Sequence, residues 1–233
     1  MAIYKNTPPI VTNGLVLALD AANPKSYVSG STVWRDLTNP LVSGSLVNGP
    51  TYNTSNGGSI VFDGVNDYAS TDHNSLLNLT ETFTISTWIY PSRTNTQGYI
   101  INKNNSYAII IGYQQGFVNF YNRAYQPSST ATQIPINVNE WVNITYSKNS
   151  NALLNNWNGY KNGIPIFSLT TSFTNTTNTN ILSLSTSNGT GDFYQGRIST
   201  IQLYNRALSA QEVLQNYNAT KGRFGLWYTE HLQ

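Results

Sequence analysis

The sequence predicts an all-β fold, in which two antiparallel sheets pack as a sandwich and one short helix lies near the C-terminus. Short segments of alternating apolar and polar residues are separated by clusters of Asn, Gly and Thr, which is typical of sandwiches. Asn makes up roughly one residue in seven, far above ordinary usage, and it favours turns. No long helical period appears before Ser209, and a chain of 233 residues can form a one-domain sandwich with a sizeable core.

The C-terminal helix is predicted from a strand that leads directly into a capping pattern. Apolar and polar residues alternate over residues 196–204, which is the periodicity of a half-buried strand. Ser209 is followed three residues later by Glu212, which is the pattern of a capping box. Leu208 and Val213 flank it with the spacing of a hydrophobic staple. We therefore expect the helix to start near Ser209.

A β-hairpin is predicted at Asn162 and Gly163. The pair lies between two strand-like segments, Trp157–Tyr160 and Ile164–Leu169. Asn-Gly is the preferred pair of a two-residue type I′ turn, because both positions need a positive φ.

The segment Gly196–Val213 resembles the last strand and helix of laminin-G-like, concanavalin-A-type jelly rolls. Four more segments resemble that family in the family's order: Gly58–Tyr68, Phe83–Pro91, Glu140–Tyr146 and Gly159–Gly163. The resemblance covers about residues 15–218 and implies a jelly-roll β-sandwich there. Residues 1–14 then form an N-terminal arm and residues 219–233 a C-terminal tail.

Composition argues against several classes of partner. Charged residues make up 9% of the chain, the net charge is +2, and Lys and Arg are scattered, so we expect no nucleic-acid partner. We expect no membrane partner, because no run approaches the length of a spanning segment. Met1–Pro9 has no apolar core of a signal peptide, and the chain has no Cys. These features suit a product made in a bacterial cytoplasm that works outside it.

Catalysis is tested by the placement of the carboxylates. Glycoside hydrolysis needs a nearby carboxylate pair, and the glucanase branch of the resembled family places two Glu on one strand. The four Glu here, Glu81, Glu140, Glu212 and Glu230, are widely separated. We therefore expect the protein not to be an enzyme.

Two metal sites are considered, and no cofactor is expected unless calcium binds at one of them. Asp63, Asn66 and Asp67 offer oxygen ligands suited to Ca²⁺, although an Asx turn explains the same residues. The resemblance to the pentraxin branch points to two other loops, Asn102–Ser106 and Ser185–Asp192. Only Asp192 of these loops is anionic, and Lys103 adds an unfavourable positive charge.

A carbohydrate site is considered at aromatic residues near loops, where rings and hydroxyl groups can meet a sugar, although packing or an interface explains most aromatic residues of a Tyr-rich sandwich. Trp157 and Tyr160 lie beside the predicted hairpin. Tyr125, together with Tyr113 and Tyr121, lies on or near predicted loops. These residues are the candidate glycan contacts.

The segment Gly14–Tyr27 resembles the start of laminin-G-like proteins that tailed bacteriophages encode. This resemblance implies a virion structural protein, such as a capsid decoration protein or a small tail or fibre component, with other virion subunits or its own copies as partners. The alternative is a lectin-like adhesin module that binds a cell-surface glycan.

Both ends of the chain are predicted to contact neighbouring subunits. Pro8-Pro9 favours an extended arm, and the tail from 219 is unusually apolar. Aromatic anchors dominate such contacts. The candidate anchors are Ile3, Tyr4, Phe224, Trp227 and Tyr228, although the tail could instead pack back on the sandwich.

Overall fold

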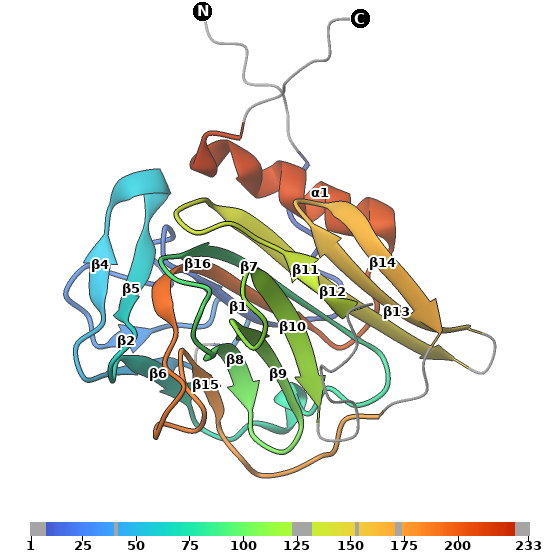
Figure 1. Cartoon of the computed structure of the whole chain (residues 1–233), viewed down its shortest axis with the longest axis horizontal. Coiled ribbons are helices and arrows are strands. Elements are labelled where there is room, and N and C mark those ends of the chain that lie inside the picture. Colours follow the sequence, from blue (N-terminus) through green and yellow to red (C-terminus); the bar gives the residue numbers. More distant parts are fainter. Residues whose placement is uncertain (1–7, 40–41, 123–131, 152–153, 171–173, 227–233) are drawn as a thin grey trace, which may run out of the picture.

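The computed structural model describes residues 8–39, 42–122, 132–151, 154–170 and 174–226. For residues 151, 154 and 155 it describes the backbone alone. Two eight-stranded antiparallel sheets pack against each other, and one α-helix forms an outer layer (Figure 1). The predicted all-β sandwich with a single C-terminal helix is confirmed. No helix within the described residues combines the length and apolarity needed to cross a membrane.

The first sheet, sheet A, lies beneath the helix. Its strands run in the order β14 (Ile164–Thr170), β13 (Leu154–Lys161), β12 (Val142–Asn151), β7 (Phe83–Pro91), β16 (Gln195–Tyr204), β5 (Ser59–Asp63) and β4 (Thr51–Asn53). β1 (Leu15–Asp20) also pairs with β16, beyond the segment that β5 occupies.

The second sheet, sheet B, forms the opposite layer. Its order is β11 (Ile134–Pro135), β10 (Phe117–Asn122), β9 (Tyr107–Ile111), β8 (Gly98–Lys103), β15 (Leu182–Leu184), β6 (Tyr68–Thr71), β3 (Gly44–Val47) and β2 (Val33–Trp34). The helical segments that lie wholly within the described residues are α1 (Ala210–Thr220) and the 3₁₀ turns Ser55–Gly57, Ser75–Leu77 and Lys221–Phe224.

The core between the sheets is rich in aromatic rings. Trp157 of sheet A stacks on Tyr146 with ring centroids 5.3 Å apart, and it meets Phe120 of sheet B edge-on at 4.6 Å. Phe83 lies 5.8 Å from Phe120, so the cluster spans both sheets. Large rings buried in this way contribute much of the apolar area that stabilises a core.

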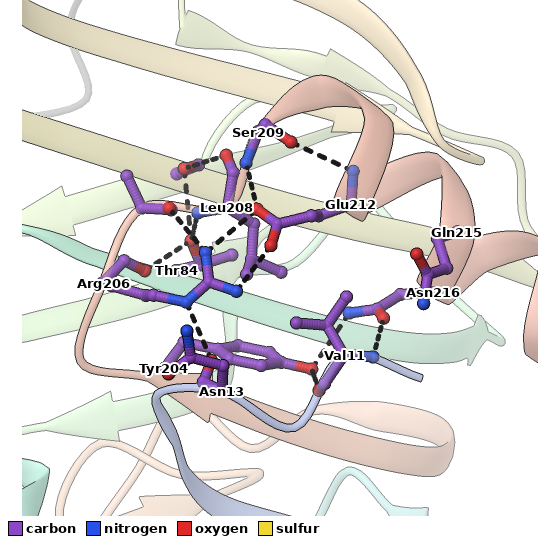
Figure 2. A network of polar contacts seen from close by, with 12 residues as sticks. Val11, Asn13, Thr84, Tyr204, Arg206, Leu208, Ser209, Glu212, Gln215 and Asn216 are labelled. Atoms are coloured by element: carbon purple, nitrogen blue, oxygen red, sulfur yellow. Dashed lines mark hydrogen bonds and ion pairs between the residues drawn. The ribbon is translucent and has the colours of Figure 1, made fainter. Parts of the chain in front are cut away.

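The hairpin and the helix start form as the sequence predicts. Asn162 and Gly163 both have positive φ, 54° and 75°, as a type I′ turn requires. Ser209 is the N-cap of α1: its hydroxyl accepts from the Glu212 N–H, and the Glu212 carboxylate accepts from the Ser209 N–H. Arg206 donates two further hydrogen bonds to the same carboxylate, at 2.9 and 2.6 Å (Figure 2).

The described part of the N-terminal arm packs on its own domain. The Val11 N–H donates to the Asn216 side chain at 2.8 Å, and the Val11 carbonyl accepts from the Tyr204 hydroxyl at 2.9 Å (Figure 2). The Arg206 side chain donates to the Asn13 carbonyl at 2.8 Å. The Gln215 side chain also donates to the Pro9 carbonyl at 2.7 Å, so these contacts tie residues 9–13 to β16, to α1 and to the loop between them.

The start of the tail also packs back on the sandwich. Phe224 is 6% exposed and stacks on Trp88, with ring centroids 4.0 Å apart. The Arg223 guanidinium pairs with the Asp20 carboxylate through bonds of 2.9 and 3.0 Å. The prediction of Phe224 as an anchor for another subunit is therefore corrected, because its own sheet already covers the ring. The other four candidate anchors, Ile3, Tyr4, Trp227 and Tyr228, lie outside the described residues.

Candidate functional site

A small polar cavity of about 110 Å³ opens at the β8–β9 hairpin of sheet B. We name it the hairpin pocket. It brings together the two loops singled out from the sequence, because residues of Asn102–Ser106 form one wall and Ser187 lies opposite. Its lining consists of Tyr99, Asn102, Lys103, Asn104, Asn105, Ser106, Tyr107, Tyr121 and Ser187.

Strand alternation explains why polar side chains reach this pocket. Ile109 and Phe120 are fully buried in the core, so their neighbours Ala108 and Tyr121 face the outside of sheet B. Ala108 pairs directly with both Tyr121 and Asn102. Because paired residues in antiparallel strands share a face, the Asn102 amide and the Tyr121 ring lie on one outer surface.

Two buried polar side chains on this outer face have no hydrogen-bond partner among the described residues. One is the Ser183 hydroxyl, in the residue paired with Asn102, and the other is the whole amide of Asn119, two residues before Tyr121. A buried polar group without a partner costs about 1–3 kcal/mol. Neither group lines the pocket, but Ser183 is paired with Asn102 and Asn119 lies on the same strand as Tyr121, and both of those residues line it.

The turn of the β8–β9 hairpin is held rigid by a crossing segment of Asn and Thr residues. Asn105 has a positive φ of 59°, a conformation that Asn tolerates well. The side-chain amides of Asn178 and Asn180 both donate to the Asn104 carbonyl, at 2.9 and 2.8 Å. Ser106 donates to the Thr176 carbonyl at 2.7 Å. The wall of the pocket is thus fixed before any ligand arrives.

Lys103 is the one charged side chain among the described residues that line the pocket. The Lys103 side chain is buried, and its ammonium donates to the Asn180 carbonyl at 2.6 Å. Burial lowers the pKa of Lys103. Burial raises the pKa of Tyr99, opposed by its hydrogen bond to Ser187, so this hydroxyl stays protonated and can donate. Neutral hydroxyl and amide groups therefore dominate the recognition chemistry.

The candidate metal residues Asp63, Asn66 and Asp67 form a closed turn. One Asp63 carboxylate oxygen accepts from the N–H groups of Val65, Asn66 and Asp67, at 2.8, 3.2 and 3.3 Å. Burial acts to raise the pKa of Asp63, but these backbone donors outweigh it and the pKa is lowered. The pKa of Asp67 is raised by burial and by the neighbouring Asp63. This arrangement is the Asx turn weighed from the sequence.

Carboxylates do not gather elsewhere in the described part of the chain, which contains no group of three or more His, Cys, Asp or Glu placed to hold a metal. Glu212 is paired with Arg206, and Glu81 lies 3.9 Å from the Lys148 ammonium. That the protein is not an enzyme stays a prediction.

The aromatic residues predicted to bind glycan are placed differently from the expectation. Trp157 has no exposed surface, because β12 and β14 flank its strand and its ring points into the core. Tyr160 is 4% exposed and packs under α1. Tyr125 lies outside the described residues, whereas Tyr121 lines the hairpin pocket. Tyr99 escaped the sequence reasoning, because a register shift between Tyr99 and Ile101 interrupts the alternation of β8.

Comparisons with known proteins agree with this fold. The binding domain of Paraclostridial mosquitocidal protein 1 is 18% identical, with a TM-score of 0.64, covering 88% of this chain and 52% of that chain. A structure of botulinum neurotoxin type C is 18% identical, with a TM-score of 0.67, and the match covers 89% of this chain and 51% of that chain. A third match is domain 4 of the extracellular arabinanase AbnA from Geobacillus stearothermophilus, in complex with arabinotriose. It is 17% identical, with a TM-score of 0.67, and the match covers 87% of this chain and 98% of that chain.

The chain spans about half the length of the toxin structures that it matches, and at these identities the likeness shows the fold alone. None of the curated protein sequences matches it. A family profile described as the concanavalin A-like lectin/glucanases superfamily, laminin G type, matches residues 63–214. The matched region includes both sides of the hairpin pocket and the capped start of α1, and the chain belongs to this superfamily.

Proposed function

We propose that this protein is a lectin-like module that binds neutral carbohydrate at the hairpin pocket. The observation that carries the proposal is the surface shared by Tyr99, Tyr121 and Asn102, beside the unpartnered Ser183 hydroxyl and Asn119 amide. Aromatic rings cover the apolar faces of a sugar, and amides and hydroxyls bond its hydroxyl groups. The cavity of about 110 Å³ suits the edge of one sugar ring, so most of an oligosaccharide would lie across the outer face of sheet B.

Two structural neighbours support this choice of ligand class. The arabinanase domain binds arabinotriose, and cell entry of the type C neurotoxin depends on interaction with two ganglioside molecules. The arabinanase domain is informative because this chain covers 98% of it. The amide and hydroxyl groups of the lining suit the hydroxyl groups of a neutral glycan.

The test is a glycan array followed by calorimetric titration of the best neutral glycan. Tyr99→Ala and Tyr121→Ala should each weaken binding by about tenfold, because loss of a ring contact and a hydrogen bond costs about 1.4 kcal/mol. Tyr113→Ala is the matched control, since Tyr113 is 49% exposed and lies outside the pocket. The proposal is refuted if Tyr99→Ala and Tyr121→Ala bind the glycan as tightly as Tyr113→Ala and the unaltered chain do.

A second candidate is the virion structural role, with capsid decoration or a tail or fibre as its place. It is supported by the resemblance of Gly14–Tyr27 to phage-encoded proteins and by Ile164 and Ile166, which are 62% and 41% exposed on β14 at the edge of sheet A. An exposed apolar edge strand favours contact with another protein. The test is co-sedimentation of the purified chain with phage particles. Co-sedimentation that is lost when Ile164→Lys and Ile166→Lys are combined would favour this role.

A further inference from the structure

A second cavity lies on the outer face of sheet A, so that the sandwich separates it from the hairpin pocket. It has a volume of about 280 Å³ and lies beside the start of α1; we name it the helix-side groove. β12 and β13 supply its floor, and the loop before α1 supplies one wall. Its lining consists of Ser147, Asn149, Asn156, Asn158, Tyr160, Ala207, Leu208, Ser209, Ala210 and Glu212.

Three carboxamides lie side by side on the floor of the groove. Asn149 pairs directly with Asn156, and Ser147 pairs with Asn158 two residues away along the same two strands, on the same face. Side chains of directly paired residues lie about 5 Å apart on one face of a sheet. No hydrogen bond joins these three amide groups to any other residue in the described part of the chain. Each amide offers two donors and one acceptor.

Tyr160 adds a hydroxyl that also has no partner among the described residues. Its ring is held in place by Tyr204, Leu208 and Val213, and the whole residue is 4% exposed. The hydroxyl itself is open to solvent at the groove, because it is not among the buried polar atoms that lack a partner. A ligand seated in the groove could therefore take the place of water at this hydroxyl.

The charge around the groove selects a neutral ligand. Glu212 is the sole ionisable carboxylate in the lining, and it is already engaged by both nitrogens of the Arg206 fork and by the Ser209 N–H. An anionic ligand would meet this carboxylate, and a cationic ligand would find no free negative charge. The remaining polar groups are amides and hydroxyls, whose natural complement is a set of hydroxyl groups.

We infer that the helix-side groove is a second binding site, which takes one ring of a neutral sugar through the Tyr160 hydroxyl and the amides of Asn149, Asn156 and Asn158. The sugar hydroxyls accept from and donate to the three amides, and one accepts from Tyr160. This site does not depend on the hairpin pocket, so each can fail without the other. Two sites on opposite faces would let one molecule bridge two glycans.

The experiment is a titration of the isotope-labelled full chain with arabinotriose and, separately, with lactose, followed by nuclear magnetic resonance. The side-chain amide signals of Asn149, Asn156 and Asn158 should shift together with at least one of these probes. Tyr160→Phe keeps the buried ring and removes only the hydroxyl, so it should raise the dissociation constant for the groove about fivefold. Asn158→Ala should weaken binding similarly.

The variant Tyr99→Ala distinguishes the two sites. It should weaken binding at the hairpin pocket about tenfold and leave the signals of the groove unchanged. A failure of the proposed function would therefore be seen separately from a failure of the groove. The inference is overturned if neither probe shifts the three amide signals. It is also overturned if Tyr160→Phe and Asn158→Ala both bind at the groove as tightly as the unaltered chain.

Discussion

The ring of Phe224 stacks on the ring of Trp88, with centroids 4.0 Å apart and planes inclined by 22°. Trp141 closes the other side, with its ring centroid 4.7 Å from that of Phe224. The Trp88 indole N–H donates to the Thr220 hydroxyl at 2.9 Å, so the end of α1 joins the same cluster. The chain after the helix thus completes the outer face of sheet A.

Replacing Phe224 by Ala should lower the free energy of unfolding by about 3 kcal/mol, because it removes a buried ring and leaves a cavity between two tryptophans. Chemical denaturation monitored by tryptophan fluorescence would measure the change. Leu214→Ala is the control, since Leu214 is 43% exposed on α1, the helix that precedes Phe224, and should cost much less. An unchanged midpoint for Phe224→Ala would show that the stack does not stabilise the domain.

Removing residues 222–233 should also destabilise the isolated domain, because the deletion takes away both Phe224 and Arg223. Arg223 pairs with Asp20 and donates to the Ser199 hydroxyl at 3.0 Å. A deletion that starts at residue 227 keeps both residues and serves as the matched control. Equal melting temperatures for the two deletions in calorimetry would contradict this reading of the tail.

Replacing Ser209 by Ala should cost about 1 kcal/mol of stability through the lost N-cap. The Ser209 hydroxyl accepts from the Glu212 N–H at 3.2 Å, and without it this donor at the helix start lacks a partner. Ser209→Asp restores an acceptor and should recover most of the loss. Thermal unfolding followed by circular dichroism would compare the three proteins. Equal stability of Ser209→Ala and Ser209→Asp would contradict the capping role of the Ser209 hydroxyl.

Local sequence patterns were sufficient for the fold because its signals are short-range. The strand over residues 196–204 and the turn at Asn162-Gly163 depend on alternation and on two backbone angles, which neighbouring residues determine. The capping box at Ser209 likewise spans four residues. In each case the residues that carry the pattern also make the contacts.

The candidate sites were only partly predictable, because they depend on which distant strands become neighbours. Tyr121 was singled out, but its proximity to Tyr99 and Ser187 requires the pairing of β8, β9 and β10 and the return of the chain after β15. Trp157 looked like a surface aromatic beside a hairpin. It is buried because β14 and sheet B enclose it, and no local pattern encodes that enclosure.

The ion pair between Arg206 and Glu212 should make stability depend on pH in the acid range. The hydrogen bonds from Arg206 lower the pKa of Glu212 from 4.5 to about 2. A group with a depressed folded pKa contributes stability above its unfolded pKa and loses it as the pH falls toward the folded value. The contribution is about 1 kcal/mol, since both side chains are about one-quarter exposed and solvent screens them.

Denaturation midpoints measured as the pH falls from neutral to about 2 would test this dependence. Glu212→Gln should be less stable than the unaltered chain near neutral pH, and the difference should shrink through the acid range. Arg206→Gln is a second variant that removes the partner and should show the same convergence. A difference that stays constant across the range would assign the effect of Glu212 to helix capping alone.

Calcium should not stabilise the protein through Asp63, Asn66 and Asp67. Asp63 already accepts three backbone N–H groups through one oxygen, and an oxygen of Asp67 accepts from the Asp63 N–H at 3.2 Å. A bound Ca²⁺ wants six to eight oxygens, so it would have to break this turn with only two carboxylates in reach. A site filled at a hundred times its dissociation constant would add about 2.7 kcal/mol of stability. Melting temperatures in millimolar calcium and in chelator should therefore coincide.

The variant Asp63→Asn separates the role of Asp63 in the turn from a role in a metal site, because an Asn side chain can keep the turn but weakens a metal site. A calcium-dependent rise in melting temperature that Asp63→Asn removes would establish the metal site and overturn this prediction.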